Sequence, residues 1–281
     1  MILSVVIPAF NEEKRLPETL KKVRNYLVRQ DFDFEVIIVD DGSRDETFRE
    51  TKYQIKHWPN FRIISYKPNR GKGFAVKTGM LAAKGEWRLL MDADNSTDIS
   101  EIEKLFNFVN TKFQIACLKA NSKQIPNSKF QKIEKLEHCD LNENCKLEIE
   151  NLSYDIIIGS RYLNKDSIKI KQPLSRRIVS RLGNWLIRII LGIKAVDTQC
   201  GFKLFSAEAS NRIFPLQTID RWGFDMEVLA IAIRKEYEIK EVPVNWYDAE
   251  GSQVKKSAAW KTLKELFLIK WNILTGKYSN D

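Results

Sequence analysis

The sequence lacks the features of a membrane-spanning, exported or disulfide-linked chain. None of its apolar runs reaches the roughly 18 residues that a helix needs to cross a bilayer. Residues 1–8 (MILSVVIP) carry no basic segment and their apolar run ends early, so we expect no signal peptide. The four cysteines have no C-x-x-C spacing, which favours free thiols in a reducing compartment over a disulfide framework.

Acidic side chains are fewer than basic ones. The chain has 46 Lys and Arg against 37 Asp and Glu, a net charge of +9. Such an excess indicates an anionic partner: nucleic acid, an anionic membrane surface or a phosphorylated substrate. A length of 281 residues suits one main core. We expect one domain over residues 1–250 and an amphipathic helical tail over 251–281.

The segment at about 111–153 differs from the rest of the chain in composition and hydrophobic periodicity. It is rich in Lys, Asn and Glu, and its hydrophobic periodicity is weak. This composition predicts a solvated insertion. It also holds four potential zinc ligands, but their spacing matches no zinc finger, so a zinc site is the weaker interpretation; they are Cys117, His138, Cys139 and Cys145.

Apolar runs and helical patterns alternate along the first ninety residues. The runs read as strands at 2–8, 34–39, 61–66 and 86–91, and the helical patterns fall at 18–29, 47–57 and 72–83. This alternation predicts an α/β fold with a mainly parallel sheet flanked by helices. A further strand is expected over 154–161.

Two later helices combine basic residues with bulky apolar ones and tryptophan. They are expected at 173–192 and 258–274. Helices of this kind are typical of a membrane interface. The alternative is that they simply pack on the core.

The organising motif is Asp92-Ala93-Asp94, which follows the strand that ends at Met91. Two carboxylates at a strand end suit a divalent cation that also binds a diphosphate, although the same pattern occurs in ordinary turns. In parallel sheets ligands bind at the carboxyl ends of the strands. The sequence therefore places a site at this edge.

Two other strand ends carry polar residues. Asp40 and Asp41 either cap the next helix or accept hydrogen bonds from a nucleobase or ribose. The loop 69–73 (NRGKG) has glycines, a helix N-terminus and the Lys72 ammonium, which together predict a diphosphate cradle. It lacks the spacing of a Walker A loop.

Six motifs occur in a fixed order along the chain: VVIPAFNEE at 5–13, VDDGS at 39–43, NRGKG at 69–73, MDAD at 91–94, GSR at 159–161 and QCGFK at 199–203. This order resembles the family 2 glycosyltransferases of the GT-A fold. More narrowly, the chain is similar to the dolichyl-phosphate β-glucosyltransferase and polyprenyl-phosphate mannosyltransferase group, with features closer to the glucosyl branch at 221–225 and 245–252.

The resemblance implies roles for individual residues. Nucleotide-sugar binding would fall to Pro8, Phe10, Glu12, Val39, Asp41, Lys72, Asp92 and Ala93. Asp92 and Asp94 would hold Mg²⁺ or Mn²⁺. The acceptor phosphate would be held by Arg161, by Arg176 or Arg177, and by Lys255 or Lys256, with each pair left undecided.

The implied reaction is transfer of a hexose from a nucleotide sugar, UDP-glucose or GDP-mannose, to polyprenyl or dolichyl phosphate with inversion at the anomeric carbon. An acceptor phosphate is already anionic, so no strong base is needed. Asp225 and Glu227 would orient sugar hydroxyls, and Asp225 would act as base for a hydroxyl acceptor; the alternative is a helix cap and a surface charge.

We expect an enzyme attached peripherally to the cytoplasmic face of a membrane. One rival is a glycosyltransferase acting on a saccharide hydroxyl. Another is a non-catalytic nucleotide-sugar or membrane-binding module. Nucleic acid is not an expected partner, because acidic strand ends would repel its phosphates.

Overall fold

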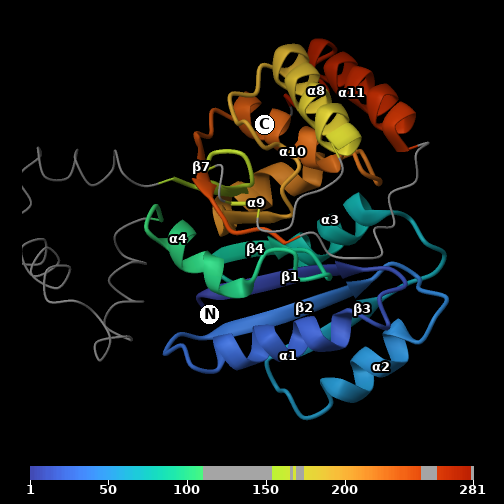
Figure 1. Cartoon of the computed structure of the whole chain (residues 1–281), viewed down its shortest axis with the longest axis vertical. Helices are drawn as coiled ribbons and strands as arrows, with labels where there is room; N and C mark the ends of the chain where they lie inside the picture. The colour runs from blue at the N-terminus through green and yellow to red at the C-terminus, as the bar shows by residue number, and fades with distance from the viewer. Residues whose placement is uncertain (110–153, 165–166, 169–173, 248–257, 280–281) are drawn as a thin grey trace, which may run out of the picture.

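The computed structural model describes residues 1–109, 154–164, 167–168, 174–247 and 258–279, with the side chains of 174–182 and 258–260 outside the description (Figure 1). Two expectations therefore lie outside the described residues: the character of the insertion at 111–153 with its candidate zinc ligands, and the phosphate-binding roles of Lys255 and Lys256. For Arg176 and Arg177 only the backbone is described.

Seven strands form one sheet in the order β3-β2-β1-β4-β6-β5-β7. Every neighbouring pair is parallel except β4 with β6 and β6 with β5, which are antiparallel. The predicted mainly parallel α/β sheet is confirmed. The strands are β1 (Leu3–Ala9), β2 (Phe34–Asp40), β3 (Phe61–Ser65), β4 (Trp87–Met91), β5 (Ile156–Ser160), β6 (Phe202–Ser206) and β7 (Ile239–Pro243).

Helices cover both faces of the sheet, so the central strands are apolar on both sides. Leu3, Val5 and Ile7 of β1 join the core on the face of α1, whereas Val6 joins the core on the face of α3. The first face is covered by α1 (Leu16–Leu27), α2 (Thr47–Gln54) and α4 (Ile102–Phe106). The second is covered by α3 (Lys72–Ala82), α9 (Ala207–Ile213) and α10 (Phe224–Arg234).

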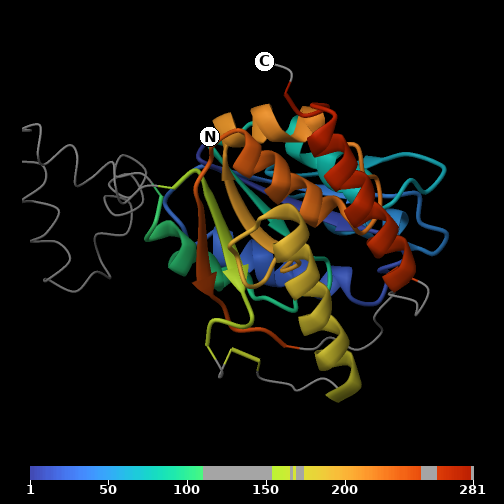
Figure 2. The same cartoon turned by 90° about the horizontal axis from the view of Figure 1, so that it is seen from above.

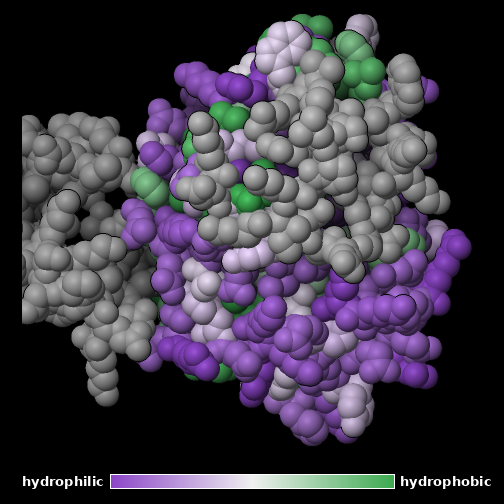
Figure 3. All heavy atoms as spheres, in the orientation of Figure 1, coloured by the Kyte–Doolittle hydropathy of each residue, from purple (hydrophilic) through white to green (hydrophobic). Residues whose placement is uncertain are grey.

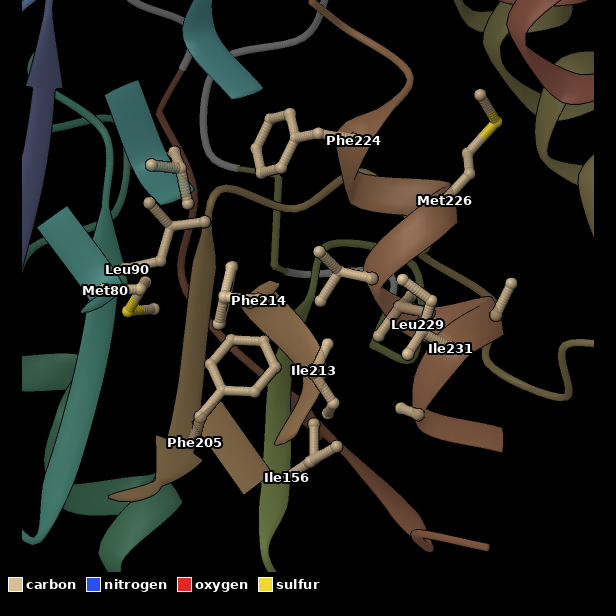
Figure 4. Packing of buried hydrophobic residues seen from close by; sticks show 14 of the residues in the cluster. Met80, Leu90, Ile156, Phe205, Ile213, Phe214, Phe224, Met226, Leu229 and Ile231 are labelled. Carbon is tan, nitrogen blue, oxygen red and sulfur yellow. The ribbon is translucent and has the colours of Figure 1, made fainter. Parts of the chain in front are cut away.

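The core of the second face joins the two halves of the chain. Figure 4 shows Met80 and Leu90 from the first half near Phe205, Phe214 and other residues of the second. The rings of Phe205 and Phe214 meet edge to face with centroids 5.3 Å apart. This packing anchors α10, whose first turn reaches the predicted site.

Helices α8 (Leu174–Leu191) and α11 (Ala258–Leu274) contact each other outside this layer and lie side by side at one end of the molecule (Figures 1 and 2). Their exposed large residues include Trp185, Ile189, Phe267, Leu268 and Trp271. In the space-filling view, hydrophilic residues cover α1 and α2, and hydrophobic residues appear at the end that carries α8 and α11 (Figure 3). Among the described residues, none of the helices combines the length and apolar character needed to cross a bilayer.

The predicted elements agree with the observed ones to within about three residues at their ends, which is the usual uncertainty of such boundaries. No prediction covers β6, β7, α4, α9 or α10. Strands β6 and β7 are only five residues long and contain charged residues, which weakens their local signal.

Candidate active site

The ends of three adjacent parallel strands bring the predicted residues to one edge. In the order β2-β1-β4, β2 ends at Asp40, β1 at Ala9 and β4 at Met91. Glu12, Asp41 and Asp92 therefore leave the sheet on the same side. Pro8 and Val39 are paired in the register and buried, and Val39 packs beneath Gly79 of α3. They form the floor of this edge.

Asp41 holds the loop at 69–71. Its carboxylate accepts hydrogen bonds from the Asn69 side chain at 2.7 Å and from the backbone N–H groups of Arg70 and Gly71, both at 2.8 Å. Asp41 is only 2% exposed. Asp40 instead accepts from the backbone of Ser43 and the hydroxyl of Ser65. Neither aspartate caps α2, whose N-cap residue is Glu46, so the helix-capping alternative is wrong.

The glycines of the 69–73 loop serve close packing as well as turning. A Cβ on Gly71 would lie 2.4 Å from the carbonyl oxygen of Asp220, and one on Gly73 would lie 2.4 Å from that of Ile219. Gly71 also has φ +119°, a conformation that favours glycine. Because the N–H groups of Arg70 and Gly71 already bond Asp41, these two cannot cradle a diphosphate in this conformation, which corrects that part of the prediction.

The Lys72 ammonium lies at the centre of the site. It is 2.7 Å from Oδ1 of Asp92, and it sits 5.5 Å from the ring centroid of Trp222 and 5.8 Å from that of Phe224. Burial lowers the pKa of Lys72, but the carboxylates of Asp92 and Asp225 raise it more, so its pKa lies above its ordinary value. Lys72 is a fixed positive charge beside the first aspartate of the motif.

The side chain of Asp92 packs directly against the backbone of Gly201. A Cβ on Gly201 would lie 2.0 Å from Oδ2 of Asp92, so only glycine allows the carboxylate to occupy this place. Gly201 belongs to the 199–203 motif of the sequence. That motif therefore reaches the site through the backbone.

Asp94, like Asp92, is partly exposed to solvent. Its Oδ1 accepts from the backbone of Ser96 at 3.0 Å, and Oδ2 lies 3.9 Å from the guanidinium of Arg15. Arg15 also pairs with Glu12. Burial raises the pKa of Glu12, Arg15 lowers it, and the nearby Asp94 and Asp92 raise it again, with a net rise. A pocket of about 440 Å³ opens beside Asp94, lined by Arg15, Glu18, Thr19, Lys22, Asp94, Asn95, Ser96 and Tyr247.

Asp225 and Glu227 have different surroundings from those expected. Asp225 is 5% exposed and forms a buried ion pair with Lys203. Glu227 is fully buried, and its oxygens accept from Thr218, Ile219 and Tyr278. The expectation that Glu227 orients a sugar hydroxyl is wrong, because the carboxylate has no exposure to solvent and binds the chain itself.

Arg161 is bound by an aspartate that the sequence analysis missed. Its Nε and Nη2 donate to the two carboxylate oxygens of Asp197 at 2.7 and 2.8 Å, and its backbone N–H donates at 3.0 Å. Burial raises the pKa of Asp197, but Arg161 lowers it more, and the net pKa is lowered. The Trp246 ring centroid lies 5.5 Å from the same guanidinium. A buried arginine requires an acidic partner, and this requirement could have pointed to an aspartate such as Asp197.

Segment 197–203 connects Arg161 with the carboxylate edge. Asp197 bonds Arg161, Gly201 packs on Asp92, and Lys203 pairs with Asp225. Between them Cys200 is buried, and burial raises the pKa of its thiol to about 12. The cysteine is therefore an uncharged core residue here.

An α/β sheet with this acidic edge, a lysine paired with Asp92 and an arginine paired with Asp197 is the arrangement of a glycosyltransferase of the GT-A class. The family model described as "Glycosyl transferase family 2" matches residues 4–148, and the chain belongs to that family. It is 33% identical to the dolichyl-phosphate β-glucosyltransferase of Dictyostelium discoideum over 98% of this chain and 75% of the relative. It is 34% identical to that of Homo sapiens, over 98% and 77%.

Solved structures show the same fold. Glucosyl-3-phosphoglycerate synthase from Mycobacterium tuberculosis, in complex with Mn²⁺, UDP-glucose and phosphoglyceric acid, matches with a TM-score of 0.60 and 15% identity. The match covers 96% of this chain and 80% of that one. The predicted family and fold are confirmed.

Proposed function

We propose that this glycosyltransferase moves glucose from UDP-glucose to a polyprenyl or dolichyl phosphate, with inversion, at the cytoplasmic face of a membrane. The observation that carries the proposal is similarity along nearly the whole chain to dolichyl-phosphate β-glucosyltransferases, together with an acidic donor edge and a separate arginine. GDP-mannose is the alternative donor.

On the donor side, Phe10, Glu12 and Asp41 lie at the edge proposed for the nucleoside, and Ala93 lies between the two aspartates. Asp41 holds the 69–71 loop with three hydrogen bonds and also interacts with the Tyr66 side chain, so its proposed role is to shape the nucleoside pocket through this loop. The Lys72 ammonium would bind the diphosphate by charge. Lys72 would therefore bind the diphosphate without the help of the backbone N–H groups of Arg70 and Gly71.

The proposed divalent ion would be shared between the chain and the substrate. Among the described residues, no group of three His, Cys, Asp or Glu side chains could enclose a metal. Asp92 and Asp94 suit the Mg²⁺ or Mn²⁺ site in which one or two carboxylates share the ion with substrate phosphates. When bound, the ion offsets charge on the departing nucleoside diphosphate.

On the acceptor side, Asp197 orients Arg161 and takes two of its five N–H donors, which leaves others for a phosphate. Orientation before binding lowers its entropic cost. Arg176 or Arg177, and Lys255 or Lys256, remain candidates for the same phosphate. The exposed apolar residues of α8 and α11 suit attachment to the lipid surface.

The reaction needs little acid–base help from the chain. A phosphate oxygen attacks the anomeric carbon, and the bond to the nucleotide phosphate breaks on the opposite side of the sugar. Asp225 is neutralised by Lys203, so it is poorly placed to act as a base. This favours a phosphate acceptor, which is already a nucleophile, over a saccharide hydroxyl.

The test is transfer from radiolabelled UDP-glucose to polyprenyl phosphate in detergent, with GDP-mannose in parallel, with Mn²⁺, Mg²⁺ or EDTA. The variant Asp94→Asn should lose at least about a hundredfold in rate, as is usual when a charge-stabilising group is removed. The exposed Asp31→Asn should match the parent. Labelled lipid from neither donor would overturn the proposal.

A further inference from the structure

Glu265 of helix α11 points toward the segment that borders the proposed donor site. Glu265 accepts a hydrogen bond from the backbone N–H of Gly223 at 2.8 Å. A Cβ on Gly223 would lie 2.6 Å from the Glu265 carboxylate and 2.8 Å from its Cβ, so the glycine allows this approach. The bond joins α11 to the residue that precedes α10.

Gly223 lies between the two aromatic residues that flank Lys72. The ring centroids of Trp222 and Phe224 are 5.5 and 5.8 Å from the Lys72 ammonium. A cation beside aromatic faces is attracted to them, and their place limits where it can move. Fixing the backbone at Gly223 therefore fixes both walls around the lysine.

A second set of bonds ties the end of α11 to the same segment. The Tyr278 hydroxyl donates to Glu227 at 2.7 Å, and Asn272 donates to that hydroxyl at 3.0 Å. Glu227 in turn accepts from the backbone of Ile219 at 2.7 Å. The Ile219 carbonyl packs against Gly73, next to Lys72. Both connections from α11 end at the residues that support Lys72.

We propose that Glu265 is a positioning residue for the donor site: by holding Gly223, it keeps Trp222 and Phe224 against Lys72. Helix α11 then has two roles. Phe267, Leu268 and Trp271 are exposed on its outer side, whereas Glu265 supports the site on its inner side. The inference rests on the proposed function in one respect, since it assigns Lys72 to the donor diphosphate.

The experiment compares Glu265→Ala, which removes the acceptor, with Glu265→Gln, which keeps one. Lys264→Ala is the matched control, because Lys264 is the exposed neighbour on the same helix. UDP-glucose affinity is measured by calorimetry, with KM and kcat alongside. We expect about tenfold weaker UDP-glucose binding and a raised KM in Glu265→Ala, values within about threefold of the parent in Glu265→Gln, and parental values in the control.

A second variant approaches the same bond from the other partner. Gly223→Ala introduces a Cβ that displaces the carboxylate, so it should weaken UDP-glucose binding as Glu265→Ala does. In the double variant of Gly223→Ala with Glu265→Ala the carboxylate is already absent and its hydrogen bond is lost only once, whereas the Cβ of residue 265 remains. The double variant should therefore lose less affinity than the sum of the two single losses. Additive losses would show that the two residues act separately and would overturn the proposal.

Hydrogen exchange at residues 218–224 gives a readout without substrate. Exchange there should be faster in Glu265→Ala than in Glu265→Gln or the control. Parental affinity and parental exchange in Glu265→Ala, or failure of Gln to restore them, would refute the positioning role. If the parent binds neither UDP-glucose nor GDP-mannose, the proposed function fails and hydrogen exchange alone decides on Glu265. If Glu265→Ala does not fold, Glu265→Gln and Gly223→Ala decide it.

Discussion

Replacing Asp197 by asparagine should destabilise the protein strongly. Asp197 is fully buried and the Arg161 side chain is 16% exposed, so the variant leaves a guanidinium without its counter-charge in the interior. Removing one partner of a buried pair costs about 3 to 5 kcal/mol. Because Arg161 keeps some contact with solvent and the asparagine side chain retains a hydrogen-bond acceptor, we expect the lower end, about 3 kcal/mol.

The loss corresponds to a fall in melting temperature of roughly 6 to 12 °C for a chain of this size. It is measured by circular dichroism at neutral pH, with Asp31→Asn as the exposed control. The double variant Asp197→Asn with Arg161→Met should recover much of the loss, because it no longer buries an unpaired charge. A melting temperature unchanged in Asp197→Asn would refute the reasoning.

The same pair makes a pH-dependent contribution. The folded pKa of Asp197 lies below its ordinary value, so its stabilising effect is fully present above the unfolded pKa of about 3.9. It is lost as pH falls through the folded pKa. The gap in unfolding free energy between the parent and Asp197→Asn should therefore narrow below about pH 4. A gap that widens in acid would contradict this sign.

Two further substitutions test the contacts of the site. Gly201→Ala should reduce transfer by about a hundredfold or more with normal folding, because its Cβ would lie 2.0 Å from Asp92; single-turnover rates measure this, and a parental rate would contradict it. Tyr278→Phe should lower the free energy of unfolding by about 1 to 3 kcal/mol, because Glu227 loses a buried donor; urea unfolding measures this, and an unchanged midpoint would contradict it.

Much of the sheet and of the acidic edge could be predicted because their signals are local. Strands β1, β2 and β4 are buried on both faces, so each reads as a continuous apolar run, and the polar residue after each run marks its end. Parallel pairing then places Asp41 and Asp92 on one side. These steps need only short stretches of sequence and the geometry of parallel strands.

The residue types at the strand ends, and with them the class of chemistry, can be read from the sequence alone. Their partners follow from the folded chain: Lys72 lies beside Asp92, Lys203 pairs with Asp225, and Asp197 pairs with Arg161. The tertiary structure also decided that β6 enters antiparallel between β4 and β5. Each of these ion pairs joins residues that are far apart in the sequence. A buried charge requires a partner of opposite sign, but chain folding alone decides which one comes within reach.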